Sequence, residues 1–265
     1  MNQKALHWFP GHMAKSLKRL EQLKKVFDVA VILLDARALK ASLNQSLLKL
    51  LQGKTILYYV TKVDLVNRAT LTAKIKDYCP HETVIVGENS LESYHLIKRE
   101  VIRLISQKRK FSLLNIKPRL VFLGIPNVGK STLINNLSRR ASLMVMNQPG
   151  VTKAEKWVAT ESFDYLDFPG LLPQHLDQET ALILSFINAM PLKIVPLDVV
   201  FEGLMTFLRT NYPKVLKTLM INQETPLESL SEKYHLALSD ENIPVLKTRF
   251  INEFHALKIR DIFFE

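Results

Sequence analysis

The stretch Gly124-Ile-Pro-Asn-Val-Gly129-Lys130-Ser131 decides the fold of this 265-residue chain. It follows the apolar run Leu120–Leu123 and opens a segment rich in Leu and Ile, so it joins a predicted strand to a predicted helix. Glycines let the backbone turn tightly enough for N–H groups to point at phosphate oxygens, and the helix N-terminus adds its positive dipole end. The stretch therefore predicts a site for the phosphates of a nucleotide with Mg²⁺.

The residues of this phosphate loop have different predicted roles. Lys130 reaches the β- and γ-phosphates, and Ser131 ligates Mg²⁺. A glycine-rich turn before an ordinary helix is the alternative, and the strand–loop–helix context argues against it. The predicted phosphate-binding residues are Asn127, Val128, Gly129, Lys130, Ser131 and Thr132.

Short β-rich runs alternate with helical patterns through residue 170. The runs are Val29–Leu34, Ile56–Val60, Thr83–Val86, Leu120–Leu123, Trp157–Thr160 and Phe163–Asp167. The helical patterns are Met13–Lys25, Ser42–Leu51, Ala69–Tyr78, Leu91–Lys110 and Lys130–Ser138. This alternation predicts an α/β domain with a mostly parallel sheet, and the apolar, non-alternating strands agree with it.

The pattern changes after Pro173, where apolar residues recur only at helical spacing. Examples are Leu204, Phe207 and Leu208, and further on Phe250, Phe254 and Leu257. We therefore expect an α/β domain over residues 1–175, with a basic segment at 1–25, and a small all-α domain over residues 176–265. Packing of these helices onto the sheet, as part of one domain, is the alternative.

The net charge is +11, and it is unevenly distributed. Residues 1–174 contain 27 Lys and Arg against 13 Asp and Glu, whereas residues 175–265 contain 9 against 12. A basic half favours a polyanionic partner, usually nucleic acid, and a solvated basic surface is the plain alternative. The basic clusters are Lys15 with Lys18 and Arg19, Lys24-Lys25, Lys98-Arg99 with Arg103, and Lys108-Arg109-Lys110. In the tail, candidate basic patches are Lys214 with Lys217, Lys247 with Arg249, and Lys258 with Arg260.

Cysteine content and hydropathy set the expected compartment. The single cysteine, Cys79, excludes an internal disulfide framework and fits a reducing environment. The longest apolar run near the start, Val29–Leu34, is too short to span a bilayer, and the first ten residues lack a signal-peptide core. We therefore expect a cytoplasmic protein with no membrane partner.

Two downstream segments match further elements of nucleotide sites. Asp167-Phe-Pro-Gly170, at the end of the next-but-one predicted strand, matches the D-x-x-G element of GTPases. There Asp167 holds Mg²⁺ through water and the Gly170 N–H senses the γ-phosphate. Between the loop and this element, Thr152 in Pro149-Gly-Val-Thr152 is the candidate switch threonine that completes the Mg²⁺ shell, against a plain turn.

A base-reading motif lies upstream of the phosphate loop. Thr61-Lys62-Val63-Asp64 follows the run Ile56–Val60 and matches N-K-x-D with Thr in place of Asn. A carboxylate at Asp64 accepts hydrogen bonds from the N1–H and 2-amino groups of guanine, a pair that adenine does not offer. The aliphatic stem of Lys62 is expected to cover the base.

The order of these motifs is a circular permutation of the usual GTPase order. With Trp8-Phe-Pro-Gly-His-Met-Ala-Lys15 and Asp35-Ala-Arg37, the chain closely resembles the YlqF/RbgA family of circularly permuted ribosome-assembly GTPases. The resemblance implies GTP hydrolysis, stimulated by the ribosomal particle, and a helical C-terminal domain. It also implies binding to ribosomal RNA on the precursor of the large bacterial subunit, late in assembly.

The resemblance also assigns residues that no motif fixes. Leu171 stands where other GTPases have a water-orienting Gln, so the resemblance suggests His12 as the catalytic residue. Contact with RNA phosphate, or capping of the following helix, is the alternative for His12. Asn127 implies a K⁺ ion against the phosphates, and Asn89-Ser90 fills the base-backing position. Thr61 replaces an Asn that ties this loop to the phosphate loop in the family, which predicts weaker guanine affinity.

Three functions remain open at this point. The leading one is a monomeric GTPase that hydrolyses GTP to time its release from a pre-ribosomal large subunit. The second is an RNA-binding assembly module in which the nucleotide is structural and hydrolysis is negligible, which Thr61 and Leu171 favour. The third is an ATPase with the same phosphate loop, against which Asp64 and the permuted order argue.

Overall fold

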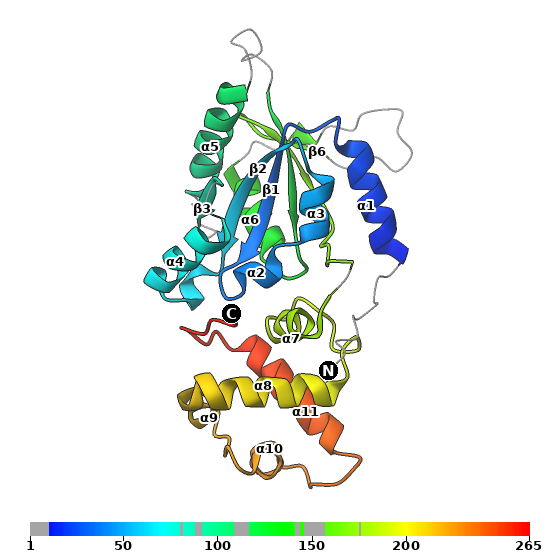
Figure 1. Cartoon of the computed structure of the whole chain (residues 1–265), viewed down its shortest axis with the longest axis vertical. Helices are drawn as coiled ribbons and strands as arrows, with labels where there is room; N and C mark the ends of the chain where they lie inside the picture. Colours follow the sequence, from blue (N-terminus) through cyan, green and yellow to red (C-terminus); the bar gives the residue numbers. More distant parts are fainter. Residues whose placement is uncertain are drawn as a thin grey trace. The chain divides into compact units, whose positions relative to one another are not determined.

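The computed structural model describes residues 11–79, 82–87, 92–108, 117–140, 144–145, 157–174 and 176–265. Contacts divide the chain after Gln174 into two compact units. The first is called the α/β unit (described residues up to 174), and the second the helical unit (residues 176–264). Figure 1 shows the helices and strands of both units.

The α/β unit is built on a sheet that has seven strands in the described residues, in the order β3-β2-β1-β4-β7-β6-β5. All neighbours from β3 to β7 are parallel, whereas β6 runs antiparallel to β7 and the edge strand β5 runs antiparallel to β6. The predicted mostly parallel sheet is therefore confirmed; β5 was missed because two residues are too few to show a pattern. The strands are β1 Val29–Asp35, β2 Thr55–Thr61, β3 Val84–Val86, β4 Arg119–Gly124, β5 Met144–Val145, β6 Trp157–Ala159 and β7 Asp164–Asp167.

The helices of this unit connect the strands in two directions. From β1 the chain moves outward to β2 and β3, and then returns past β1 to β4, so the order reverses between β1 and β4. Right-handed crossovers place the helices of the two directions on opposite faces of the sheet. Helices α5 and α6 both belong to the returning direction, and they contact each other. The elements are α1 Gly11–Leu23, α2 Leu39–Ser42, α3 Gln45–Leu50, η1 Val63–Leu65, α4 Arg68–Tyr78, α5 Ser93–Lys108 and α6 Lys130–Arg140.

The core of the α/β unit explains why its strands read as continuous apolar runs. Every residue of β1 is buried, and five of the six residues of β4 are buried, because helices cover both faces of a parallel sheet. Around β7, Phe122 and Tyr165 pack edge to face with ring centroids 5.6 Å apart. Apolar residues of α1 at helical spacing are also buried, namely Met13, Leu17, Leu20 and Leu23.

The helical unit confirms the predicted all-α tail. Its longest helices, α8 and α11, pack through Phe201 and Phe250, whose rings meet edge to face at 5.8 Å. The predicted helical spacing of Leu257 with Phe250 and Phe254 is wrong. The helix ends at Ala256, and Leu257 lies just after it with 41% exposure. The elements are α7 Gln178–Phe186, α8 Leu197–Asn211, α9 Pro213–Thr218, α10 Pro226–Tyr234 and α11 Ile243–Ala256.

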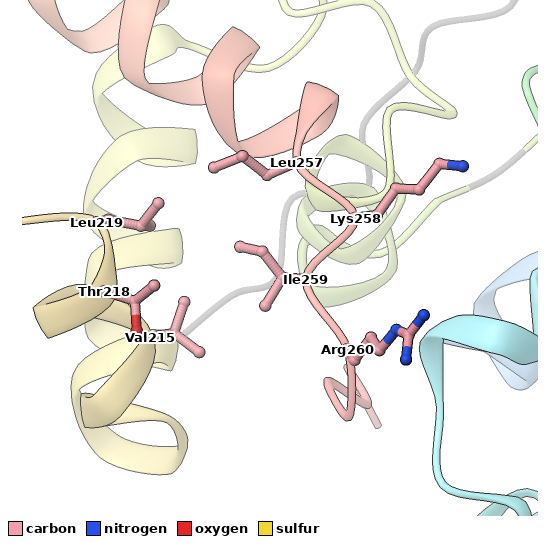
Figure 2. Close-up of a pocket in the computed structure, with 7 residues that line it drawn as sticks. All are labelled: Val215, Thr218, Leu219, Leu257, Lys258, Ile259 and Arg260. Carbon is pink, nitrogen blue, oxygen red and sulfur yellow. The ribbon is translucent and has the colours of Figure 1, made fainter.

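A small pocket lies in the helical unit between α9 and the segment that follows α11. Figure 2 shows Leu257 and Ile259 pointing toward α9, whereas Lys258 and Arg260 point away from it. The pocket has a volume of about 340 Å³ and an apolar lining. None of the helices in the described ranges is long and apolar enough to cross a membrane.

Candidate functional site

The motif residues gather at the carboxyl ends of four neighbouring parallel strands. Strand register pairs Leu33 of β1 with Gly124 of β4, and Phe122 of β4 with Asp167 of β7. On the other side, Asp35 of β1 pairs with Thr61 of β2. The strand order reverses between β1 and β4, and such a switch point is where open α/β sheets bind ligands.

The phosphate loop runs from the end of β4 to the first turn of α6. Asn127 and Gly129 have positive φ values of 55° and 103°, which make the loop turn back on itself. Val128 between them is buried, at 1% exposure, and anchors the turn in the core. A Cβ at Gly124 would lie 3.0 Å from the Val128 side chain and 3.1 Å from the Leu33 carbonyl oxygen. This close approach explains the glycine at the start of the loop.

Two charged side chains meet at the loop. The Lys130 ammonium donates a hydrogen bond to the Asp167 carboxylate. The phosphate-loop lysine and the D-x-x-G aspartate are therefore in direct contact. Ser131 and Thr132, in the first turn of α6, are exposed. A cation, a carboxylate and hydroxyl groups at a helix N-terminus form a set of groups that suits phosphate with a hard divalent ion.

The Asp167–Gly170 segment packs directly against the phosphate loop. A Cβ at Gly170 would lie 2.9 Å from the backbone N and Cα of Pro126, so a larger residue would displace the loop. The Leu171 N–H donates to the Gly124 carbonyl at 2.9 Å. The Leu171 side chain is 1% exposed, so it is part of the core.

Asn44 is a residue of this region that sequence reasoning missed. Its side-chain amide donates to the Leu171 carbonyl at 3.2 Å, and its Oδ1 accepts from the Leu47 N–H at the start of α3. Asn44 is 3% exposed, so both contacts are made away from water. An Asn before a helical pattern signals an N-cap, but nothing in the sequence indicates the contact 127 positions away.

Thr61 links the predicted base-reading loop to the phosphate loop. Its Oγ1 lies 2.5 Å from the Val128 carbonyl oxygen and 3.1 Å from that of Leu34, and the side chain is fully buried. A hydroxyl has one hydrogen to donate, and the shorter distance favours Val128. Thr61 therefore makes the kind of link that the resemblance ascribes to Asn.

Asp64 is presented outward by the short helix η1. Its neighbours Val63 and Leu65 are 3% and 8% exposed and hold the turn against the core. Asp64 between them is exposed. Its carboxylate is therefore accessible to a ligand that approaches the ends of β2 and β4.

A buried carboxylate lies next to this loop. Asp35 accepts hydrogen bonds from Arg37 and from the Lys62 ammonium, the latter at 2.7 Å. Burial by itself would raise the pKa of the Asp35 carboxyl, but the hydrogen bonds and charges of Arg37 and Lys62 outweigh burial and lower it. The carboxylate is therefore charged at neutral pH and holds both cations in place.

Several predicted site residues lie outside the described residues. These are Thr152, Asn89 and Ser90, together with the side chain of His12. The strand before Asn89 does end at a constrained point: a Cβ on Gly87 would lie 1.9 Å from the Tyr59 hydroxyl oxygen. That hydroxyl shares a buried 2.7 Å hydrogen bond with Ser93.

The predicted basic clusters differ in availability. On α1, Lys15 and Lys18 are exposed opposite the buried apolar face. On α5, Arg99 and Arg103 both bond Glu100, which offsets part of their charge. Lys247 of the helical unit is no surface cation: it is 7% exposed and donates to Asp198 at 2.7 Å. The prediction of Lys247 as part of a basic surface patch is therefore wrong, whereas its predicted partner Arg249 is exposed.

Known proteins resemble this chain over most of its length. A family model described as a 50S ribosome-binding GTPase matches residues 119–226. Ribosome biogenesis GTPase A of Bacillus licheniformis is 33% identical over 234 residues, covering 84% of this chain and 82% of the relative. A probable ribosome biogenesis GTPase A of Mycoplasma pneumoniae is 30% identical over 217 residues, with 80% and 77% covered.

Two solved structures resemble the fold. GNP-bound YlqF from T. maritima has a TM-score of 0.64 at 21% identity, with 95% of this chain and 97% of that chain covered. A GDP-bound structure of TM YlqF has a TM-score of 0.59 at 20% identity, with 93% and 98% covered. The likeness confirms the predicted fold, a circularly permuted phosphate-loop domain followed by a helical region.

Proposed function

Because this chain belongs to the ribosome biogenesis GTPase A family and is a GTPase, we propose that it hydrolyses Mg²⁺-bound GTP during late assembly of the large ribosomal subunit. We further propose that it binds ribosomal RNA of the precursor particle. The observation that carries the proposal is the hydrogen bond from Thr61 to Val128, which joins the base-reading and phosphate-binding loops. A single nucleotide that spans both loops fits this arrangement.

Guanine recognition falls to Asp64 in this proposal. Its exposed carboxylate accepts from the N1–H and 2-amino groups of guanine, and the stem of Lys62 covers the base. Asn89 and Ser90, which follow β3 in the sequence, are proposed to back the base. The Thr61 hydroxyl supports the proposal, because it supplies the link between loops in the absence of Asn.

In this proposal the phosphate loop binds the phosphates and contributes to the Mg²⁺ site. Backbone N–H groups from Asn127 to Thr132 and the Lys130 ammonium hold the phosphates, and the Gly170 N–H meets the γ-phosphate. Nucleotide binding then requires the Lys130–Asp167 ion pair to open. The proposed Mg²⁺ ligands are Ser131, Thr152 and, through water, Asp167.

These donors fit the ion because Mg²⁺ prefers hard oxygen ligands and usually takes few protein groups beside phosphate and water. No group of three or more His, Cys, Asp or Glu that would hold a metal without phosphate occurs in the part of the chain that the structure describes. When bound, Mg²⁺ neutralises charge that develops on the phosphates. Asn127 additionally helps to hold a K⁺, which turnover in K⁺ compared with Na⁺ tests.

Water activation requires a residue from elsewhere. The Leu171 side chain is apolar and buried, so it does not orient water. We assign this role to His12, at the start of α1, as a neutral imidazole that positions or deprotonates the attacking water. We propose that the ribosomal particle stimulates this hydrolysis.

The RNA-binding role rests on the exposed lysines of α1 and on the charge of residues 1–174. Phosphate contacts made by Lys15 and Lys18 would give affinity that falls steeply with salt. We propose that residues 1–175 and 176–265 act as two domains, the first for the nucleotide and the second for ribosomal contact. The protein is proposed to act as a monomer in the cytoplasm.

One experiment separates this proposal from its competitors. Purified protein is assayed for hydrolysis of GTP and of ATP, each with and without large ribosomal subunits. The proposal predicts GTP hydrolysis that the subunits stimulate, and little ATP hydrolysis. Subunit binding without GTP turnover would instead identify an RNA-binding assembly module with a structural nucleotide.

A further inference from the structure

A charged cluster next to the base-reading loop includes two residues, Asp35 and Arg37, that have no role in the proposed reaction. Arg37 Nε and Nη2 donate to the two carboxylate oxygens of Asp35 at 3.0 and 2.8 Å, and the Arg37 N–H donates to the same carboxylate at 3.1 Å. Lys62 Nζ donates to Asp35 Oδ2 at 2.7 Å. The side chains of Asp35, Arg37 and Lys62 are 1%, 13% and 23% exposed.

The geometry of the cluster restrains the carboxylate more than charge balance requires. Lys62 alone would neutralise Asp35, so the contribution of Arg37 is orientation. A bidentate guanidinium–carboxylate pair fixes the plane of the carboxylate, which a single ammonium does not. The fixed carboxylate then gives the Lys62 ammonium one favourable position.

The position of Lys62 in turn determines that of the loop. Lys62 has a φ of 55° and is the N-cap of η1, so the turn begins at a left-handed residue. A non-glycine residue adopts this conformation at an energetic cost and keeps it when its surroundings hold it. Here the hydrogen bond from Lys62 to Asp35 stabilises this conformation. Asp64 follows two residues later, so its position depends on the turn that begins at Lys62.

We propose that Arg37 is a positioning residue for guanine selectivity: through Asp35 it holds Lys62, and through Lys62 it sets where the Asp64 carboxylate lies. This inference rests on the proposed reading of guanine by Asp64. Arg37 itself does not contact the base and acts only through Asp35 and Lys62. Its loss is therefore expected to change selectivity for the base and not affinity for the phosphates.

The test compares GDP with IDP, which lacks the 2-amino group and so loses one of the two hydrogen bonds to Asp64. Both affinities are measured by titration calorimetry for the wild type, Arg37→Ala and Arg37→Lys. The wild type is expected to prefer GDP about tenfold, the value of one hydrogen bond to a charged group. In Arg37→Ala we expect a preference of about twofold or less, because GDP loses two hydrogen bonds to Asp64 and IDP loses only the one from N1–H, so the affinity for GDP falls more than that for IDP. In Arg37→Lys, which keeps the charge but not the fork, an intermediate preference is expected.

Lys117→Gln is the matched control. It removes an ion pair of the same unit, with Asp164 at 3.0 Å, at the amino ends of β4 and β7 and hence at the opposite edge of the sheet. This variant should keep the GDP preference of the wild type. It shows whether loss of any ion pair in the unit changes base selectivity.

Three results would overturn the inference. An unchanged GDP preference in the Arg37 variants, or an equal loss of GDP and IDP affinity, would leave Arg37 a merely structural residue. If Arg37→Ala does not fold, Arg37→Lys decides by the same ratio. A wild type that binds GDP and IDP equally would overturn the guanine reading by Asp64 itself, so the two failures are distinguishable.

Discussion

Replacement of Thr61 by Val removes the hydrogen bond between the two nucleotide loops and leaves the shape of the side chain nearly unchanged. The hydroxyl lies 2.5 Å from the Val128 carbonyl oxygen in a fully buried position. Loss of one buried hydrogen bond, with its acceptor left unpaired, costs about 1–3 kcal/mol. For a protein of this size that corresponds to a melting temperature lower by roughly 2–4 °C per kcal/mol.

Part of the cost should appear in nucleotide affinity, because a nucleotide that contacts both loops needs them in register. A coupling of about 1.4 kcal/mol weakens GDP binding about tenfold. GDP affinity is measured by calorimetry and the free energy of unfolding by urea titration. We expect Thr61→Val to lower both.

Thr160→Val serves as the control for this prediction. Thr160 is 3% exposed and donates a 2.6 Å hydrogen bond to the Phe163 carbonyl in the β6–β7 turn, away from the base-reading loop. It should lower stability to a similar extent but leave GDP affinity unchanged. Equal GDP affinity in the wild type and Thr61→Val, or equal losses of affinity in the two variants, would refute the coupling.

Four further predictions concern other parts of the site. Asp64→Asn should weaken GTP binding at least tenfold and favour XTP, whose 2-oxo group accepts a hydrogen bond from the Asn amide; competition titration measures both. Gly170→Ala should abolish stimulated GTP turnover, because the new Cβ would lie 2.9 Å from the Pro126 backbone, and unimpaired turnover would contradict this packing. His12→Ala should cut subunit-stimulated turnover about 100-fold or more with little change in nucleotide affinity, and unchanged turnover would remove His12 from the mechanism. Because the pKa of Asp35 is lowered in the folded state, its stabilisation is present above about pH 4 and is lost as the pH falls through the folded-state pKa; Asp35→Asn should flatten that part of the acid-unfolding curve.

Much of the fold was predictable from short segments of consecutive residues. The phosphate loop is a strand, a turn and a helix in consecutive residues, so its glycines and Lys130 identify it without any distant contact. The parallel strands β1, β2 and β4 were predicted within one or two residues of their ends, because burial on both faces makes their runs apolar. The short strand β5 and the turn that ends α11 before Leu257 left no such pattern.

Charge and motif substitutions were less informative than their structural surroundings. Lys247 counts as a basic residue of the tail, yet its ammonium is bonded to Asp198 and buried. Thr61 replaces an expected Asn and predicts weaker guanine affinity, yet its hydroxyl reaches the phosphate loop. A count of charges or a match to a motif does not contain the distance between side chains.

The sequence by itself determined the class of fold, the phosphate loop and the permuted order of the motifs, because each of these is encoded in residues close together along the chain. Only the tertiary structure decided how the loops are held. The links from Lys62 to Asp35, from Thr61 to Val128 and from Asn44 to Leu171 join residues 27, 67 and 127 positions apart. Such contacts have no periodicity in the sequence, since they depend on which strands become neighbours in the sheet.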